Sequence, residues 1–139
     1  MEFLFRFDIN PTPASRPRIT RWTTYYGAKY QAFKDEMAIM VSNAWKGKEP
    51  IEGPIFVETV YHVPIAKGVP QKKRDLLDGT WCQLNIDIDN LDKALYDSLN
   101  KIIYLDDKQI VWHNNIKIWT SGYGKIVIKL KTLAQLTLK

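Results

Sequence analysis

The chain has 139 residues and a formal net charge of +5, with 45% hydrophobic and 25% charged residues. These values are typical of one globular domain with a single core, which we expect over residues 1–139. No apolar run approaches the roughly 20 residues that span a bilayer. Arg6 and Asp8 interrupt the apolar N-terminus, unlike in a signal peptide. One cysteine, Cys82, excludes an internal disulfide, and with two histidines it makes no convincing zinc set. We therefore expect a cytoplasmic protein with no membrane partner.

The acidic residues are unevenly distributed along this basic chain. Eight of the 15 lie within 33 positions: Asp75, Asp78, Asp87, Asp89, Asp92, Asp97, Asp106 and Asp107. A compact acidic cluster in a basic protein suits a metal site set in a polyanion-binding surface. Helix caps and turns, which favour aspartate, are the simpler explanation of the same clustering.

The first half of the chain shows one strand pattern and one helix pattern. Residues 3–9 alternate apolar and polar side chains, which predicts a strand with one buried face. Three prolines then favour a loop or irregular edge over residues 10–27. From 28 to about 45 the apolar residues recur every three or four positions, which predicts an amphipathic helix.

The second half predicts three strands and one helix. Residues 55–63 are rich in β-branched and aromatic side chains, as in a strand. The polar stretch 66–85 is expected to be a long, mobile loop. A helix is predicted from about 90 to 101, followed by strands over 109–119 and 124–132 that a tight turn joins as a hairpin. The order β-α-β-α-β-β predicts an α+β fold with two main helices packed on a mixed sheet.

The segment DIDNLDKALYDSLN at 87–100, with YLDD at 104–107, carries the residues suited to chemistry. Asp87 and Asp89 are two positions apart, so they point the same way on an extended segment. Lys93 and Asp97 follow Asp89 at steps of four, on one face of a helix. Asp106 and Asp107 come after a short connection that can return the chain to the same end of the sheet. Three or four carboxylates and one ammonium are thus expected to converge on one patch.

Carboxylates at this density raise one another's pKa unless a positive charge lies among them. Mg²⁺ is the natural candidate, because it prefers oxygen ligands and is often held by one or two carboxylates plus a substrate phosphate. A metal so held can polarise a phosphodiester and generate a hydroxide nucleophile. Lys93 then either neutralises charge on the phosphate or holds the attacking water.

Each of these residues also has a purely structural explanation. Asp89 is in the position of a helix N-cap, Lys93 and Asp97 form an ordinary i,i+4 pair, and the Asp106–Asp107 pair suits a turn. An EF-hand calcium loop is excluded, because Asp92 stands where glycine is required and Ser98 where glutamate is required.

The same segment resembles the signature of RusA-like Holliday junction resolvases, in which Asp-x-Asp-Asn-Leu-x-Lys precedes an aspartate, Leu-Asn and an Asp-Asp pair. The resemblance implies that the metal-binding carboxylates are Asp87, Asp89 and Asp107 and that the essential lysine is Lys93. Asp97 and Asp106 match further acidic positions and are secondary metal candidates. It also implies an α+β homodimer that uses Mg²⁺, or Mn²⁺ in its place, to make paired nicks in four-way DNA junctions during recombination and repair. Such enzymes are often encoded by phages and prophages.

The resemblance extends to the Pro/Arg-rich segment 13–18 and covers most of the chain at the level of element order. Many relatives have Lys-Pro before the first catalytic aspartate, whereas Asn85-Ile86 stand here, and the 66–85 segment is long. These departures concern the DNA contacts beside the site rather than metal binding.

Two basic segments are candidates for DNA contacts. Arg16, Arg18 and Arg21 are interspersed with prolines and aromatic residues, so they can reach phosphates while Trp22, Tyr25 or Tyr26 stack on unpaired bases. The second segment is Lys72-Lys73-Arg74. Arginines that only keep a loop soluble, and rings that only cover the core, are the alternative.

A four-way junction has near two-fold symmetry, so two symmetric nicks need two active sites related by a two-fold axis. We therefore expect a homodimer, for which apolar strand faces near the termini are candidate interfaces. The rival hypotheses are a non-catalytic module that binds branched DNA and a nuclease that acts mainly on flaps or forks. Carboxylates facing DNA weaken phosphate affinity, which disfavours the binding module.

Overall fold

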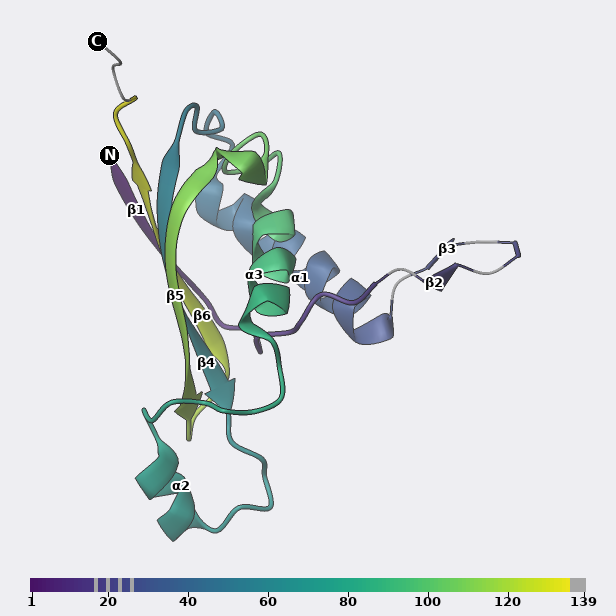
Figure 1. Cartoon of the computed structure of the whole chain (residues 1–139), viewed down its shortest axis with the longest axis vertical. Helices are drawn as coiled ribbons and strands as arrows, with labels where there is room; N and C mark the ends of the chain where they lie inside the picture. Colours follow the sequence, from purple (N-terminus) through teal and green to yellow (C-terminus); the bar gives the residue numbers. More distant parts are fainter. Residues whose placement is uncertain (17, 20, 23, 26, 136–139) are drawn as a thin grey trace.

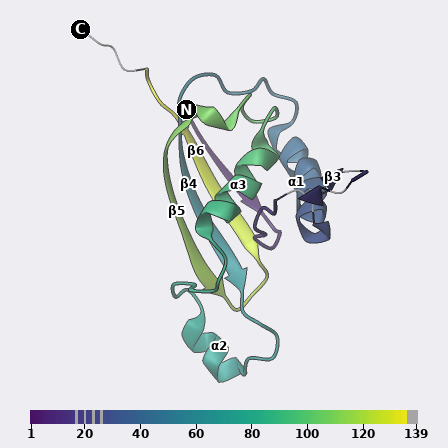
Figure 2. The same ribbon diagram turned by 45° about the vertical axis from the view of Figure 1, so that its right-hand side comes forward.

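A four-stranded mixed sheet carries two helices on one face and leaves its other face open (Figures 1 and 2). The computed structural model describes residues 1–135 except 17, 20, 23 and 26, and for 18, 19, 24 and 25 it describes the backbone alone. The sheet contains, in spatial order, β1 (Glu2–Phe7), β6 (Lys125–Thr132), β4 (Ile55–Pro64) and β5 (Ile110–Thr120). The covering helices are α1 (Ala28–Trp45) and α3 (Ile88–Leu99). The predicted α+β class with two main helices on a mixed sheet is confirmed.

Helix α1 forms where the apolar spacing predicts it. Its buried residues recur every three or four positions, namely Tyr30, Phe33, Met37, Val41 and Trp45. The helix ends at Lys46, which adopts a left-handed conformation with φ of 56° and donates its N–H to the carbonyl of Ser42. The buried face of α1 packs with α3 and the sheet around one core. Among the described residues no helix has the length and apolar character needed to cross a membrane.

The predicted hairpin between the last two strands is wrong. β5 and β6 follow each other in the chain, but β4 lies between them, parallel to β5 and antiparallel to β6. β4 buries every second residue, from Ile55 to Val63, and so supplies a central strand. The link from Thr120 to Lys125 has only to pass two strand spacings, about 9.6 Å, which its length allows.

The segment 66–85 is not a featureless loop. Helix α2 (Gln71–Leu77) lies at one end of the sheet (Figure 1), and residues after it bond to β5. Trp119 donates its N–H to Thr80, and Cys82 donates its N–H to Lys117. The prediction of a loop is therefore wrong for residues 71–77. The contacts between this segment and the sheet join residues far apart in the chain, so local patterns do not show them. The mobility of the segment stays a prediction.

The proline-rich segment after β1 contains a short ladder of β2 (Arg18–Ile19) and β3 (Thr24–Tyr25), which projects away from the sheet (Figure 1). Before the ladder, the N–H of Ala14 donates to the carbonyl of Asn90 at 2.9 Å. This bond ties the base of the projecting segment to the first turn of α3.

The pairing of β5 with β4 shifts by one residue near its start. Ile110 pairs with Ile55, but the next pair is Trp112 with Phe56, which leaves Val111 as an extra residue. Such a bulge changes which side chains face each side of a sheet. Beyond it, His113 pairs with the buried Val57, so His113 faces the helices.

Candidate active site

The N-terminal end of α3 carries the first group of predicted site residues. Asp87 occupies the position before the helix, but its side chain makes no capping hydrogen bond. Asp89 lies in the first turn and Lys93 one turn later, and all three side chains are exposed. The N-cap explanation of Asp89 is therefore wrong, since Asp87 takes that position. Within the described part of the chain, no ion pair joins Lys93 to either carboxylate or to Asp97, so the simple i,i+4 pair is absent.

The second group of carboxylates lies at the C-terminal end of α3. Asp106 starts a 3-10 helix, η1 (Asp107–Gln109), and accepts the N–H of Lys108 at 2.9 Å. This backbone bond is the main cause that lowers the pKa of Asp106, which confirms the turn explanation for this residue. The pKa of Asp107 is raised, first by burial, then by a hydrogen bond to the Asp106 carboxyl and by the charges of Asp97 and Asp106. Asp97 itself accepts the hydroxyl of Tyr30 at 3.3 Å.

The structure separates these two groups along the helix instead of joining them. A helix rises about 1.5 Å per residue, so the ten residues from Asp87 to Asp97 cover about 15 Å. Asn100 to Tyr104 form a tight turn, with the N–H of Lys101 donating to Tyr104, and the chain passes directly into η1. Among the described residues, no three side chains of His, Cys, Asp or Glu are grouped closely enough to hold a metal ion. The expected convergence of Asp87, Asp89 and Asp107 is therefore not seen.

The donor chemistry nevertheless suits a hard cation. Both groups offer carboxylate oxygens only, and Mg²⁺ is commonly held by one or two carboxylates, with water and substrate phosphate completing its shell. The Asp106 carboxyl contacts that of Asp107, so Asp107 has a negative charge beside it. Because Asp107 is partly buried, water screens this charge only in part. A cation at this pair would relieve that repulsion. The site therefore fits Mg²⁺ as a partial ligand set.

A polar network between α3 and β5 was missed by the sequence patterns. The helix-facing side of β5 is polar, with His113, Asn115 and Lys117, whereas its outer side carries Trp112, Ile116 and Ile118. This reversal of the usual pattern was visible in the sequence, but the bulge is needed to show which side faces the helices. The polar side of β5 faces α3 next to the candidate carboxylates.

The network is built around a buried carboxylate. Asp92 is 6% exposed, and among the described residues it is the one buried carboxylate. It accepts the hydroxyl of Tyr61 at 2.6 Å, and its other oxygen lies 3.8 Å from Nδ1 of His113. Nδ1 also lies 3.0 Å from the hydroxyl of Tyr96, to which Asn115 donates at 2.6 Å. Three residues from two elements, Asp92 and Tyr96 of α3 and Asn115 of β5, thus lie at one edge of the imidazole.

Lys117 connects the same strand to the segment that leads to Asp87. Its Nζ donates to the carbonyl of Leu84 at 2.9 Å and to that of Ile86 at 2.5 Å. The ammonium therefore fixes the backbone immediately before the first candidate carboxylate. Lys117 is a positioning residue that the sequence analysis did not identify.

The candidate DNA-binding residues differ in how free their charges are. Arg16, Lys72 and Lys73 are exposed. Arg21 is exposed too, and its guanidinium lies 5.2 Å from the ring centre of Trp22. The side chains of Arg18, Tyr25 and Tyr26 lie outside the described residues. Arg74 donates to the carbonyls of Ala66 and Ser121, at 2.9 and 3.0 Å, so its guanidinium fixes α2 to the sheet end.

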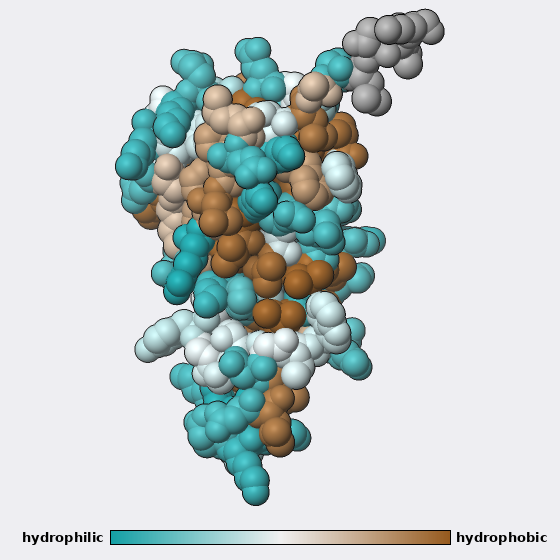
Figure 3. Space-filling model, turned by 90° about the vertical axis from the view of Figure 1, so that its left-hand side faces the viewer, coloured by the Kyte–Doolittle hydropathy of each residue, from teal (hydrophilic) through white to brown (hydrophobic). Residues whose placement is uncertain are grey.

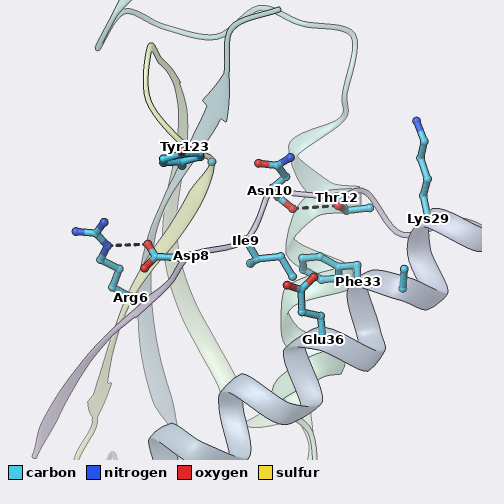
Figure 4. Close-up of a pocket in the computed structure, with 11 residues that line it drawn as sticks. Arg6, Asp8, Ile9, Asn10, Thr12, Lys29, Phe33, Glu36 and Tyr123 are labelled. Carbon is cyan, nitrogen blue, oxygen red and sulfur yellow. Dashed lines mark hydrogen bonds and ion pairs between the residues drawn. The ribbon is translucent and has the colours of Figure 1, made fainter. Parts of the chain in front are cut away.

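A hollow of about 680 Å³ lies away from the candidate carboxylates (Figure 4). It is formed by the end of β1, the start of α1 and the turn before β6. Asp8 in its wall is paired with Arg6 at 2.9 Å, and Glu36 also faces it. Its lining carries two cations, Arg6 and Lys29, as well as the two carboxylates, and it includes none of the candidate site residues, so we do not assign the chemistry to it.

Comparison with known proteins identifies the family to which this chain belongs. A model of the family described as Endodeoxyribonuclease RusA matches residues 8–131. Proteins named crossover junction endodeoxyribonuclease RusA, from Escherichia coli strain K12 and from Escherichia coli O1:K1, are 27% identical over 124 residues. The match covers 86% of this chain and 88% of each relative. The α+β domain with its carboxylate-bearing helix is therefore an endodeoxyribonuclease domain. The chain belongs to the RusA endodeoxyribonuclease family.

Proposed function

We propose that this chain is a structure-selective endodeoxyribonuclease that resolves four-way DNA junctions by paired, symmetric phosphodiester hydrolysis, in DNA recombination and repair. The observation that carries the proposal is the family match over residues 8–131, which spans both carboxylate groups and Lys93. Relatives named for crossover junction cleavage align over nearly the same length. A DNA substrate also makes the cytoplasm the expected compartment.

The reaction is proposed to depend on Mg²⁺, with Mn²⁺ as a substitute. Two pairs of residues would each supply a partial ligand set for a cation, Asp106 with Asp107 at one end of α3 and Asp87 with Asp89 at the other, and Asp97 adds negative charge near Asp107. When bound, the cation supplies Lewis acidity to the scissile phosphate. Lys93 lies between the two groups on the exposed side of α3, where its ammonium can neutralise charge that develops on the phosphate.

The DNA backbone is proposed to contact cations in two segments, one between β1 and α1 and one on α2. Arg16 and Arg21, together with Arg18, belong to the segment that Ala14 ties to the first turn of α3. Lys72 and Lys73 lie on α2. Arg74 is excluded from this set, because its guanidinium is already bonded to backbone carbonyls.

A homodimer is proposed to form through the open face of the sheet. Apolar residues gather on part of this face (Figure 3). A shallow hollow there is lined by Leu4, Val60, Ile116 and Val127, with Glu58, Asn114 and Lys129 among its polar neighbours. At one end Trp112, 60% exposed, contacts Phe56 with ring centres 4.1 Å apart. Two such sheets can pack face to face, about 10 Å apart. Because α3 and β5 lie on the other side and at the sheet edge, both active sites stay accessible in that dimer.

The dimer is tested by Ile116→Lys, which puts a charge among the apolar residues that line the hollow of this face. Light scattering coupled to size exclusion should report a dimer for the unmodified chain and a monomer for the variant. Lys73→Ala, on α2, is the control that should remain dimeric. A variant that stays dimeric would place the interface elsewhere.

The activity is tested by incubating the protein with a labelled four-way junction, a linear duplex and a single strand, each with Mg²⁺ or EDTA. Metal-dependent, symmetric nicking of the junction alone supports the proposal. Binding without cleavage would indicate a branched-DNA-binding module. Preferential cutting of flaps or forks, added as further substrates, would indicate a different structure-selective nuclease.

A further inference from the structure

The hollow beside Asp107 contains a histidine with one edge of its ring held in place. This hollow, of about 270 Å³, is lined by Tyr96, Asp107, Ile110, Val111, Trp112 and His113. The side chain of His113 is 52% exposed, although Nδ1 lies against the polar network. The opposite nitrogen, Nε2, is therefore left for solvent or for a bound molecule.

The network around His113 includes a carboxylate whose burial opposes folding unless it is compensated. A buried carboxylate such as Asp92 is unfavourable unless it is paired and hydrogen-bonded, and an apolar residue of similar size is often as stable or more stable. Asp92 has Tyr61 as its hydrogen-bond donor, and its second oxygen faces His113. The Asp92 carboxylate therefore lies beside the edge of the imidazole that carries Nδ1.

The ring is also restrained in orientation. The Tyr96 hydroxyl lies 3.0 Å from Nδ1, and the side-chain amide of Asn115 lies 3.3 Å from the same atom. Tyr96 comes from α3 and Asn115 from β5, so two rigid elements hold the imidazole edge. The bulge at Val111 makes this possible, because it turns His113 toward α3.

We propose that His113 is a catalytic residue that donates a proton from Nε2 to the leaving sugar oxygen during phosphodiester cleavage, with Asp92, Tyr96 and Asn115 as its positioning residues. The proposal rests on the proposed nuclease function. The oxygen of a water molecule attacks phosphorus and the bond from phosphorus to one sugar oxygen breaks. That oxygen takes the proton from Nε2 and becomes a hydroxyl, the attacking water loses a proton to solvent, and His113 regains one from solvent.

The variant His113→Asn separates catalysis from structural support. The asparagine amide takes the place of Nδ1, so it can still bond to Tyr96, but it presents no group at the place of Nε2. Single-turnover cleavage of the four-way junction with Mg²⁺ should fall by about 100-fold or more, in the range known for lost proton transfer. Junction affinity, measured with Ca²⁺ in place of Mg²⁺, should change less than about threefold. Asn43→Ala, at an exposed position of α1 away from both the proposed site and the proposed dimer face, is the control and should cleave normally.

A substrate with sulfur in place of the leaving sugar oxygen gives the decisive comparison. A thiolate leaves without taking a proton, so the unmodified chain and His113→Asn should cleave this junction at rates within about threefold of each other. A defect of equal size on the oxygen and sulfur junctions would overturn the role, as would His113→Asn cleavage within tenfold of the unmodified chain. If His113→Asn does not fold, as judged by circular dichroism, His113→Gln is used in the same comparison. An unmodified chain that cuts no DNA would instead refute the proposed nuclease function, and the role of His113 with it.

Discussion

Replacing Lys117 with methionine removes the two hydrogen bonds by which β5 holds the segment that leads to Asp87. Methionine keeps most of the apolar stem, so the change isolates the ammonium and its bonds to the carbonyls of Leu84 and Ile86. A hydrogen bond from a charged donor contributes about 1.5–3 kcal/mol when buried. Leu84 is 44% exposed, so water can replace part of the loss, and we expect about 1.5 kcal/mol in total.

This loss of stability has a measurable size. Unfolding entropies of about 2.1 cal/mol/K per residue give roughly 0.3 kcal/mol/K for a chain of this length, so Tm should fall by about 5 °C. Calorimetry checks this value. The freed segment no longer fixes Asp87, so kcat for junction cleavage should fall at least about tenfold with little change in KM, since small displacements of catalytic groups are costly.

Two further variants make the reasoning about Lys117 refutable. Lys117→Arg keeps a charged donor and should recover most of both losses. Lys125→Met, on β6, removes a lysine that makes no bond to this segment and should leave kcat unchanged. If Lys117→Met lowered Tm as expected but kept full activity, the lysine would have no role in placing Asp87. An unchanged Tm would mean that the two hydrogen bonds contribute nothing to stability.

Three other replacements test the remaining site residues. Asp89→Asn should abolish cleavage yet leave junction affinity equal or higher, because it removes a charge that repels phosphate; retained turnover would exclude Asp89 from the mechanism. Asp107→Asn should abolish cleavage and raise Tm by about 1–2 °C at neutral pH, from roughly 0.5 kcal/mol of relieved repulsion. The folded-state pKa of Asp107 is raised, so its ionised form destabilises the fold. The gain in Tm should therefore disappear as pH falls below the usual pKa of 3.8. A gain in Tm that does not depend on pH would contradict the assignment. Arg16→Ala should weaken binding to every DNA sequence alike and reduce the salt dependence of affinity, whereas an unchanged salt slope would argue against a phosphate contact.

Local patterns predicted most of the elements and supplied the candidate site residues. The apolar spacing of α1, the alternation of β4 and the Asp87–Asn100 segment are all properties of neighbouring residues, and each of these elements forms close to its expected bounds. The spacing at which side chains return to the same face of an element is set by backbone geometry, so it can be recognised in the sequence. The carboxylates and Lys93 are recognisable for the same reason, because their spacing on one helix is local.

Only the tertiary structure decided how these elements meet. The insertion of β4 between β5 and β6 depends on contacts far apart in the chain, and an adjacent-strand rule predicts a hairpin instead. The turn after α3 keeps Asp107 about one helix length from Asp87, which spacing alone does not reveal. One extra residue at Val111 turns His113 toward Asp92. A single-residue shift moves side chains to the other face of a sheet, and it depends on the partner strand rather than on the strand's own sequence.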